Sequence, residues 1–184
     1  MSARVQQKEQ TRTRILDSAA RAIRERGLAR PSVNEVMADA GLTVGGFYAH
    51  FDSKDTLLLE ALRTMFGERM DEWLARLPEG PPDVRRQQAA RGYLSRKHRD
   101  TGAERCPMPV ILGELDRADP RIRELIAGYL GDWAKALAGA KEPDGRRNAL
   151  AAIATMVGAL TLARALGPTS FSDELLAAAK AAVR

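Results

Sequence analysis

The feature that most constrains this chain is the segment 32–54, which carries the start and stop signals of two short helices. Ser32 is a good N-cap residue and Glu35 follows three positions later, so the pair predicts a capping box. Gly41 can adopt the left-handed backbone that ends a helix, and Thr43 is then placed to cap the next one. This order of caps around a glycine turn predicts a helix-turn-helix.

The second helix of this motif has a predicted inner and outer side. Phe47 and Phe51 are four residues apart, so they fall on one face and are expected to be buried. Ser53 is placed to cap a third helix that starts at Lys54. The outer side of the second helix then carries Val44, Gly45, Tyr48, Ala49 and His50.

The run from Ala40 to Leu57 resembles the DNA-binding segment of TetR-family transcriptional repressors. Their pattern is a glycine turn, a tyrosine, a variable residue, a histidine or equivalent, an aromatic residue, and serine or asparagine before lysine. The resemblance implies an all-α fold with a three-helix DNA-binding domain, here residues 1–53. A helical effector-binding and dimerisation domain is expected over residues 54–184.

The resemblance also implies roles for single residues. Tyr48, His50 and Lys54 match positions that contact the DNA backbone, and four others match positions that face bases. Two of these, Val44 and Ala49, offer no hydrogen bonds, so base readout must depend on thymine methyl groups, on polar neighbours or on DNA shape. The full predicted set is Asn34, Thr43, Val44, Gly45, Gly46, Tyr48, Ala49, His50 and Lys54.

The glycine pair in the second helix allows two interpretations. Gly45 and Gly46 each weaken a helix by about 1 kcal/mol relative to alanine. They either permit close approach of the backbone to the duplex or only make a short helix more flexible, with no role in DNA binding.

The net charge of +5 is concentrated at the start of the chain. Residues 1–30 hold eight basic and three acidic side chains, and the rest of the chain is balanced. Arginines that face outward from a first helix over residues 12–26 would attract phosphates. The alternative is that this segment is only a solvated face.

Helical periodicity continues through the chain, with no strand pattern, and gives about nine helices in all. The later helices are predicted over residues 54–77, 83–99, 107–119, 122–139, 149–163 and 172–184. Residues 149–163 carry no charge, but 15 residues fall short of the roughly 20 that a bilayer requires, so no membrane is expected.

The last two helices are predicted to form a homodimer interface, as the resemblance implies. The alternative is that they only close the core of their own subunit. The predicted interface residues are Ile153, Met156, Val157, Leu160, Leu175, Leu176 and Ala179.

The middle helices are expected to hold an unknown small-molecule effector near Trp73, Tyr93, Tyr129 and Trp133, although each of these could be an ordinary core residue.

The segment around Cys106 resembles that of a TetR subgroup, some of whose members sense oxidants or electrophiles through a cysteine. In this chain Arg105 replaces the usual glycine before it, and an inert core cysteine is the alternative. A single cysteine excludes an internal disulfide and a cysteine-cluster zinc site, and neither a metal nor a cofactor is predicted.

These features predict a dimeric, ligand-responsive repressor that binds a palindromic operator in double-stranded DNA and has no enzymatic activity. The polar segment 1–14 lacks the apolar core of a signal peptide, so a cytoplasmic location is expected. Two alternatives are a basic protein that coats DNA without sequence preference and a thiol-dependent enzyme that uses His98 and Cys106.

Overall fold

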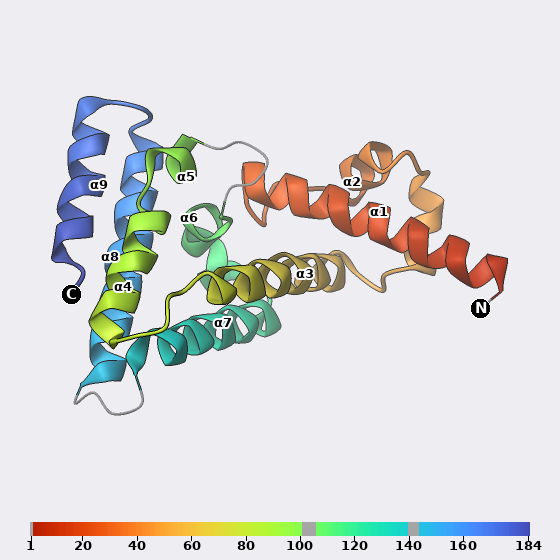
Figure 1. Ribbon diagram of the computed structural model, residues 1–184. Helices are drawn as coiled ribbons and strands as arrows, with labels where there is room; N and C mark the ends of the chain where they lie inside the picture. The colour runs from red at the N-terminus through yellow and green to blue at the C-terminus, as the bar shows by residue number, and fades with distance from the viewer. Residues whose placement is uncertain (1, 101–105, 140–143) are drawn as a thin grey trace. The chain divides into compact units, whose positions relative to one another are not determined.

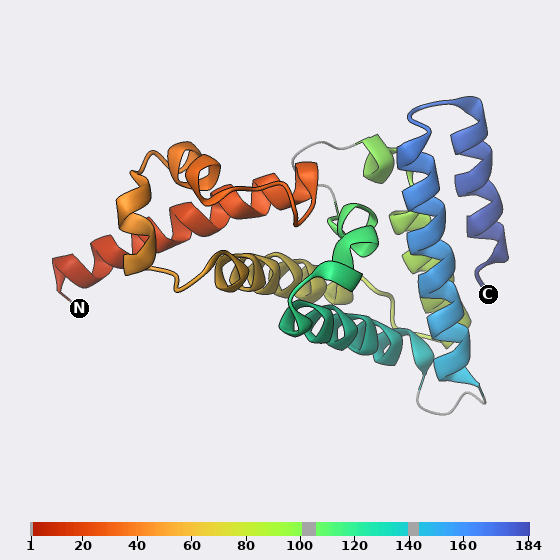
Figure 2. The same cartoon turned by 180° about the vertical axis from the view of Figure 1, so that it is seen from behind.

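A computed structural model describes residues 2–100, 106–139 and 144–184 (Figures 1 and 2). All regular structure in these ranges is helical, with nine α-helices and two 3₁₀ helices, so the predicted all-α fold is confirmed. The chain forms two compact units, Met1–Gly67 with Val110–Leu125, and Glu68–Pro109 with Ile126–Arg184. The boundary predicted between residues 53 and 54 separates a DNA-binding domain from an effector-binding domain. That boundary is defined by function and stays a prediction.

The first unit is built on the packing of α1 (Ala3–Arg26) against α2 (Val33–Asp39). The 3₁₀ helix η1 (Val44–Ala49) follows, and α3 (Lys54–Ala75) begins in this unit. A second 3₁₀ helix, η2 (Leu112–Arg117), also belongs to this unit. The core is apolar and includes Ile15, Ala19, Ile23, Val36, Met37, Phe47, Phe51, Leu58 and Leu62.

Helix α1 begins at Ala3, nine residues earlier than the predicted start at residue 12. Residues 3–10 are all exposed, so they carry no apolar stripe that periodicity could detect. Gln, Lys, Glu and Arg are good helix formers, and the packed part of the helix serves as the nucleus from which this polar end extends.

The loop after α1 is fixed by a carboxylate from η2. The backbone amides of Leu28 and Ala29 donate to the side chain of Glu114, the second at 3.3 Å. Gly27 has φ +84°, and a β-carbon there would lie 2.6 Å from a Glu114 oxygen. The positive φ favours glycine at this position, and a side chain there would also displace the Glu114 carboxylate from the loop.

The second unit is centred on α8 (Gly145–Ala165), which packs against α4 (Pro82–Tyr93), α5 (Arg96–Asp100) and α9 (Ser170–Ala182). In both views α4, α8 and α9 lie side by side. The short α6 (Met108–Ile111) spans the division between the units, and α7 (Pro120–Ala138) contributes residues to both.

Three predicted boundaries in this part of the chain were wrong. The helix expected over 83–99 ends at Tyr93, and Ser95 starts a new helix by accepting a hydrogen bond from the His98 amide at 3.1 Å. The helix expected over 107–119 is divided into α6 and η2. The last helix begins at Ser170 with Thr169 as N-cap, and Ser172 completes the capping box instead of being the cap. The run Pro143, Asp144 and Gly145 also predicts a turn, but Pro143 lies outside the described ranges.

Helix α8 has 21 residues, and its length and composition alone would allow it to cross a membrane. It is longer than the 15-residue uncharged stretch in the sequence because it starts at Gly145. One side of it is buried against α4 and α9, as in the core helix of a water-soluble protein, and such core helices have the same length and composition.

Candidate DNA-binding site

The scaffold of the site is a buried serine that joins α1 to α2. The Ser18 hydroxyl is 2% exposed and lies 3.0 Å from the Val36 carbonyl oxygen and 2.6 Å from the Asp39 carboxylate. Arg21 also pairs with Asp39 at 2.6 Å. The hydrogen bond from Ser18, followed by that from Arg21, holds the pKa of Asp39 below its ordinary value, so the carboxylate is ionised at neutral pH.

The predicted start and stop signals of α2 are confirmed. The Glu35 amide donates to the Ser32 hydroxyl at 3.2 Å, and the Ser32 amide donates to the Glu35 carboxylate at 2.9 Å. Gly41 adopts φ +69°, and the Leu42 amide then donates to the Met37 carbonyl oxygen at 2.8 Å. The turn of the predicted helix-turn-helix therefore forms as expected.

The second helix of the motif is a 3₁₀ helix of six residues. Thr43 does not cap it through its side chain, contrary to the prediction. Two consecutive glycines disfavour a longer α-helix, and the element is held mainly by burial of Phe47, whose ring stacks on Phe51 at 5.8 Å. Its inner side is thus as predicted, while its backbone is wound more tightly.

Most of the predicted DNA contacts are on the surface of the first unit. Tyr48 is 74% exposed and Val44 is 41% exposed. Asn34, Thr43 and Ala49 are also exposed. A β-carbon at Gly45 would meet no atom within 4 Å, whereas one at Gly46 would lie 3.8 Å from the Met37 methyl group. Gly45 therefore faces open space, and Gly46 faces the protein instead of the groove expected for it.

His50 is half-buried and is tied to α1 through its backbone. Its carbonyl oxygen accepts a hydrogen bond from Arg12, whose guanidinium also lies over the Phe51 ring at 4.3 Å and pairs with Glu60. Burial, and then the positive charges of Lys8 and Arg12, lower the pKa of His50 below its ordinary value. The lowered pKa favours the neutral imidazole in the protein without DNA, and this form can donate one hydrogen bond.

Lys54 stands at the N-terminus of α3, as predicted, and Ser53 caps that helix by accepting from the Thr56 amide at 3.1 Å. The Lys54 ammonium donates to the Ala29 carbonyl oxygen at 3.1 Å. To bind a DNA phosphate, the ammonium would either leave the Ala29 carbonyl oxygen or donate to both acceptors at once.

The arginines of α1 are exposed or half-buried, and four of them are bound within the first unit. Arg14 donates to the Ala40 carbonyl oxygen, and Arg21 and Arg26 pair with carboxylates of α2. With Arg12 bound to Glu60, four of the eight basic residues in the first 30 hold the unit together. Arg4, Lys8 and Arg30 are also exposed.

The predicted effector residues partly converge in the second unit. The ring of Trp133 lies 5.1 Å from that of Trp73 and 5.4 Å from that of Tyr93. The Tyr93 hydroxyl is 3.4 Å from the Cys106 sulfur, and Cys106 is half-buried. Tyr129 is half-buried on α7. Arg105, which the sequence places beside the cysteine, lies outside the described residues.

The predicted dimer residues lie mostly in the core of their own subunit, and the dimer interface itself stays a prediction. Ile153, Met156, Val157 and Leu160 on α8, with Leu176 and Ala179 on α9, are buried within their own subunit, and Leu175 is half-buried. With 0 to 9% of their surface accessible, the six buried side chains can contribute little to a contact with a partner. The sequence showed that α8 is apolar nearly all round, but it could not show which side α4 and α9 cover.

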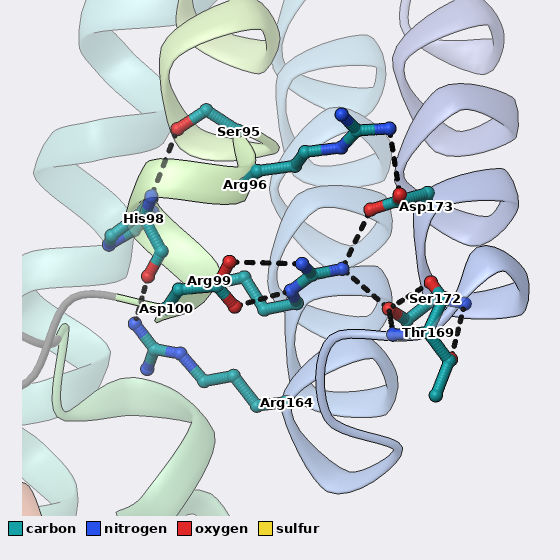
Figure 3. A network of polar contacts seen from close by, with 9 residues as sticks. All are labelled: Ser95, Arg96, His98, Arg99, Asp100, Arg164, Thr169, Ser172 and Asp173. Carbon is teal, nitrogen blue, oxygen red and sulfur yellow. Dashed lines mark hydrogen bonds and ion pairs between the residues drawn. The ribbon is translucent and has the colours of Figure 1, made fainter.

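A polar network joins α5 to α8 and α9 (Figure 3). The buried Arg99 donates to the Ser172 hydroxyl at 2.5 Å and to the carboxylates of Asp173 and Asp100 at 2.8 and 2.6 Å. Arg164 of α8 donates to the carbonyl oxygens of His98 and Cys106 at 2.8 and 2.7 Å. The local sequence gave no signal for this network because Arg99 and its α9 partners are more than 70 residues apart.

His98 and Cys106, the pair suggested for thiol chemistry, both hydrogen-bond to Tyr93. Nδ1 of His98 hydrogen-bonds to the Tyr93 carbonyl oxygen at 2.7 Å, so it carries the proton. The Cys106 thiol contacts the Tyr93 hydroxyl, whose pKa is raised well above its ordinary value by burial and then by Cys106. Within the described ranges, no group of three metal-binding side chains comes together.

Comparisons with known proteins agree with this geometry. The profile of "Bacterial regulatory proteins, tetR family" matches residues 15–61, from the middle of α1 into α3. The HTH-type transcriptional repressor KstR2 of Rhodococcus jostii (strain RHA1) is 44% identical over 52 residues, which are 28% of this chain and 26% of that protein. The HTH-type transcriptional regulator AcrR of Shigella flexneri is 34% identical over 85 residues, 45% of this chain and 40% of that protein. The matches thus span well under half the length of these relatives.

Similarity over the whole fold comes from solved structures. The crystal structure of a TetR transcriptional regulator from Chloroflexus aurantiacus J-10-FL is 28% identical, with a TM-score of 0.76, and the match covers 97% of this chain and 94% of that one. The similarity therefore includes the helices after α3, where the curated relatives give little guidance.

Proposed function

Because the chain belongs to the TetR family of bacterial transcriptional regulators, we propose that it is a repressor that binds a palindromic operator as a homodimer and releases it when a small molecule binds. The observation that carries this proposal is the exposed outer side of η1, where Val44, Gly45 and Tyr48 are presented on a buried Phe47 anchor. Regulators of this family are generally not enzymes. The site of action would be the cytoplasm.

The proposed DNA contacts fall into two groups, those to phosphates and those to bases. Tyr48, Lys54 and the neutral His50 would bind phosphates and set the register, and the outer side of η1 would lie against base edges in the major groove. Val44 and Ala49 offer only methyl contacts there, so Thr43 and Asn34 are the polar candidates for base readout.

The alternative of a nonspecific DNA coat is less well supported by the electrostatics. Nonspecific affinity depends on the number of cations that neutralise phosphates. Arg12, Arg21 and Arg26 pair with carboxylates of the first unit, which lowers the net positive charge of the basic cluster, although the pairs of Arg21 and Arg26 are exposed and neutralise charge only weakly.

The proposed dimer face is the outer side of α8 and α9. Leu150, Leu162 and Phe171 are 43%, 54% and 58% exposed. Between these leucines lie Ala154 and Gly158, and a β-carbon at Gly158 would meet no atom within 4 Å. Small residues let a second helix approach closely, and the exposed apolar side chains would be covered by the partner.

The network of Figure 3 supports a route from effector to dimer face. Arg164 binds the carbonyl oxygens of His98 and Cys106, next to the aromatic cluster, and Arg99 binds α9. A ligand that shifts α5 would move α8 and α9 with it, which would favour a dimer whose recognition helices no longer fit the operator.

Selection of genomic DNA fragments by the purified protein at fixed physiological salt tests the function. We expect a palindromic sequence to be enriched, with half-sites about 34 Å apart or somewhat more and affinity at least 1,000-fold above random DNA. If no sequence is enriched and binding decreases uniformly with salt, the protein is a nonspecific binder and the proposal is wrong.

Replacement of Gly45 by alanine tests whether the backbone approaches DNA. The added methyl group has open space in the protein, so we expect unchanged folding. If η1 lies against the duplex, operator affinity should fall roughly ten-fold, or about 1.4 kcal/mol, in a titration of the selected site. Gly128→Ala is the matched control because its β-carbon also has open space, on α7. Unchanged operator affinity in Gly45→Ala would favour the alternative that the glycines only make the helix more flexible.

A further inference from the structure

The second unit contains a hollow of about 400 Å³ between the end of α3, α4 and α5. Its size is within the range of small-molecule sites, roughly 300 to 1,000 Å³. Trp73 and Tyr93 line it, together with Gln88 and Ser95. The hollow is therefore large enough for a ligand of one or two rings.

The aromatic side of the hollow is held rigidly. Trp73 meets Trp133 edge to face, at 86° and 5.1 Å between ring centroids, and Tyr93 meets His98 at 79° and 4.7 Å. Trp133 is 6% exposed, and its indole nitrogen is buried without a hydrogen-bond partner among the described residues. Flat apolar ligands stack well on such rings, and the cluster also contains a donor without an acceptor.

The charged side of the hollow is basic. Arg76, Lys97 and His98 line it, and no carboxylate is among the described lining residues. Glu72 lies 3.8 Å from Arg76, but both side chains are largely exposed, at 69% and 80%, so this pair neutralises the rim only weakly. Tyr93 adds no negative charge because burial raises the pKa of its hydroxyl well above the ordinary value.

We propose that this hollow binds an aromatic carboxylate, with the ring against Trp73 and Tyr93 and the carboxylate toward Arg76 and Lys97, and that this ligand releases the operator. The proposal rests on the repressor function proposed above and adds the chemical class of the effector. A cationic aromatic ligand would gain from the rings but would be repelled by the basic rim.

Three probes of the same shape separate the contributions of ring and charge. They are 2-naphthoate, the neutral 2-naphthamide and the cationic 2-naphthylmethylammonium ion, each titrated into the full chain by calorimetry. We expect the carboxylate to bind at least ten-fold more tightly than the amide and the cation to bind most weakly. Both tryptophans of the chain belong to this cluster, so quenching of tryptophan fluorescence locates the bound probe.

Variants of the rim test the assignment of charge. Arg76→Gln with Lys97→Gln should lower 2-naphthoate affinity at least ten-fold and leave 2-naphthamide affinity unchanged. Arg91→Gln with Lys135→Gln is the matched control, since both side chains are exposed on the second unit and neither lines the hollow. Circular dichroism confirms that each variant is folded.

The outcomes for this site and for the repressor function are distinguishable. If the protein binds its selected operator but shows no preference for 2-naphthoate over the other probes, the ligand class is wrong and the repressor function stands. If 2-naphthoate binds with the expected preference and operator affinity falls when it is added, the proposal is supported. If it binds and operator affinity does not change, the hollow is not the effector site.

Discussion

Leu162→Glu is expected to convert the protein to a monomer and to lower its affinity for a palindromic operator about 100-fold or more. Leu162 is 54% exposed on the outer side of α8, so a charged side chain there does not disturb the subunit core. In a dimer that pairs through this face, the two carboxylates would be buried in the interface without a partner, which is strongly unfavourable. Loss of the second half-site removes the gain of bivalent binding, which is typically 100-fold or more.

Sedimentation velocity at micromolar concentration measures the assembly, and titration of the selected operator measures the binding. Val84→Glu is the matched control because Val84 is 43% exposed and apolar but lies on α4. A Leu162→Glu protein that sediments as a dimer would show that the outer side of α8 is not the interface.

Arg99→Gln is expected to lower the midpoint of thermal unfolding by about 10 °C, because it removes the buried member of a charged network. The Arg99 side chain is 4% exposed and joins α5 to Ser172 and Asp173 of α9. Glutamine cannot reach all of these acceptors or balance their charge. The change is measured by circular dichroism or calorimetry at pH 7.

Arg96→Gln is the matched control for this variant. Arg96 pairs with the same carboxylate, Asp173, at 2.7 Å, but its side chain is 73% exposed. Its removal should lower the midpoint by at most 2 °C, since exposed ion pairs contribute little. Equal losses in Arg96→Gln and Arg99→Gln would mean that burial of the network has no special importance.

The pH dependence of the same variants gives an independent measurement. The hydrogen bond from Arg96, and then that from Arg99, hold the pKa of Asp173 below its ordinary value near 4. A lowered pKa in the folded state stabilises the protein fully above the unfolded pKa, and this contribution is lost as the pH falls through the folded pKa. The temperature of the unfolding midpoint should therefore decrease as the pH is lowered below 4 in the unchanged protein. The decrease should be less steep in both Arg96→Gln and Arg99→Gln, because each variant removes one of the hydrogen bonds to Asp173.

The second unit shows how far local pattern can mislead. Helix α8 was expected to be apolar and buried, but only one side of it is buried. The residues predicted to contact a partner lie mostly on that buried side or on the buried side of α9. Periodicity identifies an apolar helix but not the neighbour that covers each side of it, because that neighbour is chosen by contacts distant in the sequence. The leucines left exposed, such as Leu162, are no different in type from the buried ones.

The first unit shows the opposite case. The Ser32–Glu35 capping box, the glycine turn at Gly41 and the Ser53 cap formed as predicted, since each depends on residues within five positions of each other. The outer position of Tyr48 followed from the burial of Phe47 and Phe51.

The sequence by itself determined the all-α fold, the helix-turn-helix and most of the residues that it exposes, because helix periods, caps and turns are encoded locally. Only the tertiary structure decided that Arg12 and Arg14 bind inside the first unit, that Glu114 fixes the loop after α1, and that Arg99 ties α5 to α9. Each of these contacts joins residues 26 or more positions apart, and packing of the whole chain, not local propensity, brings such side chains together.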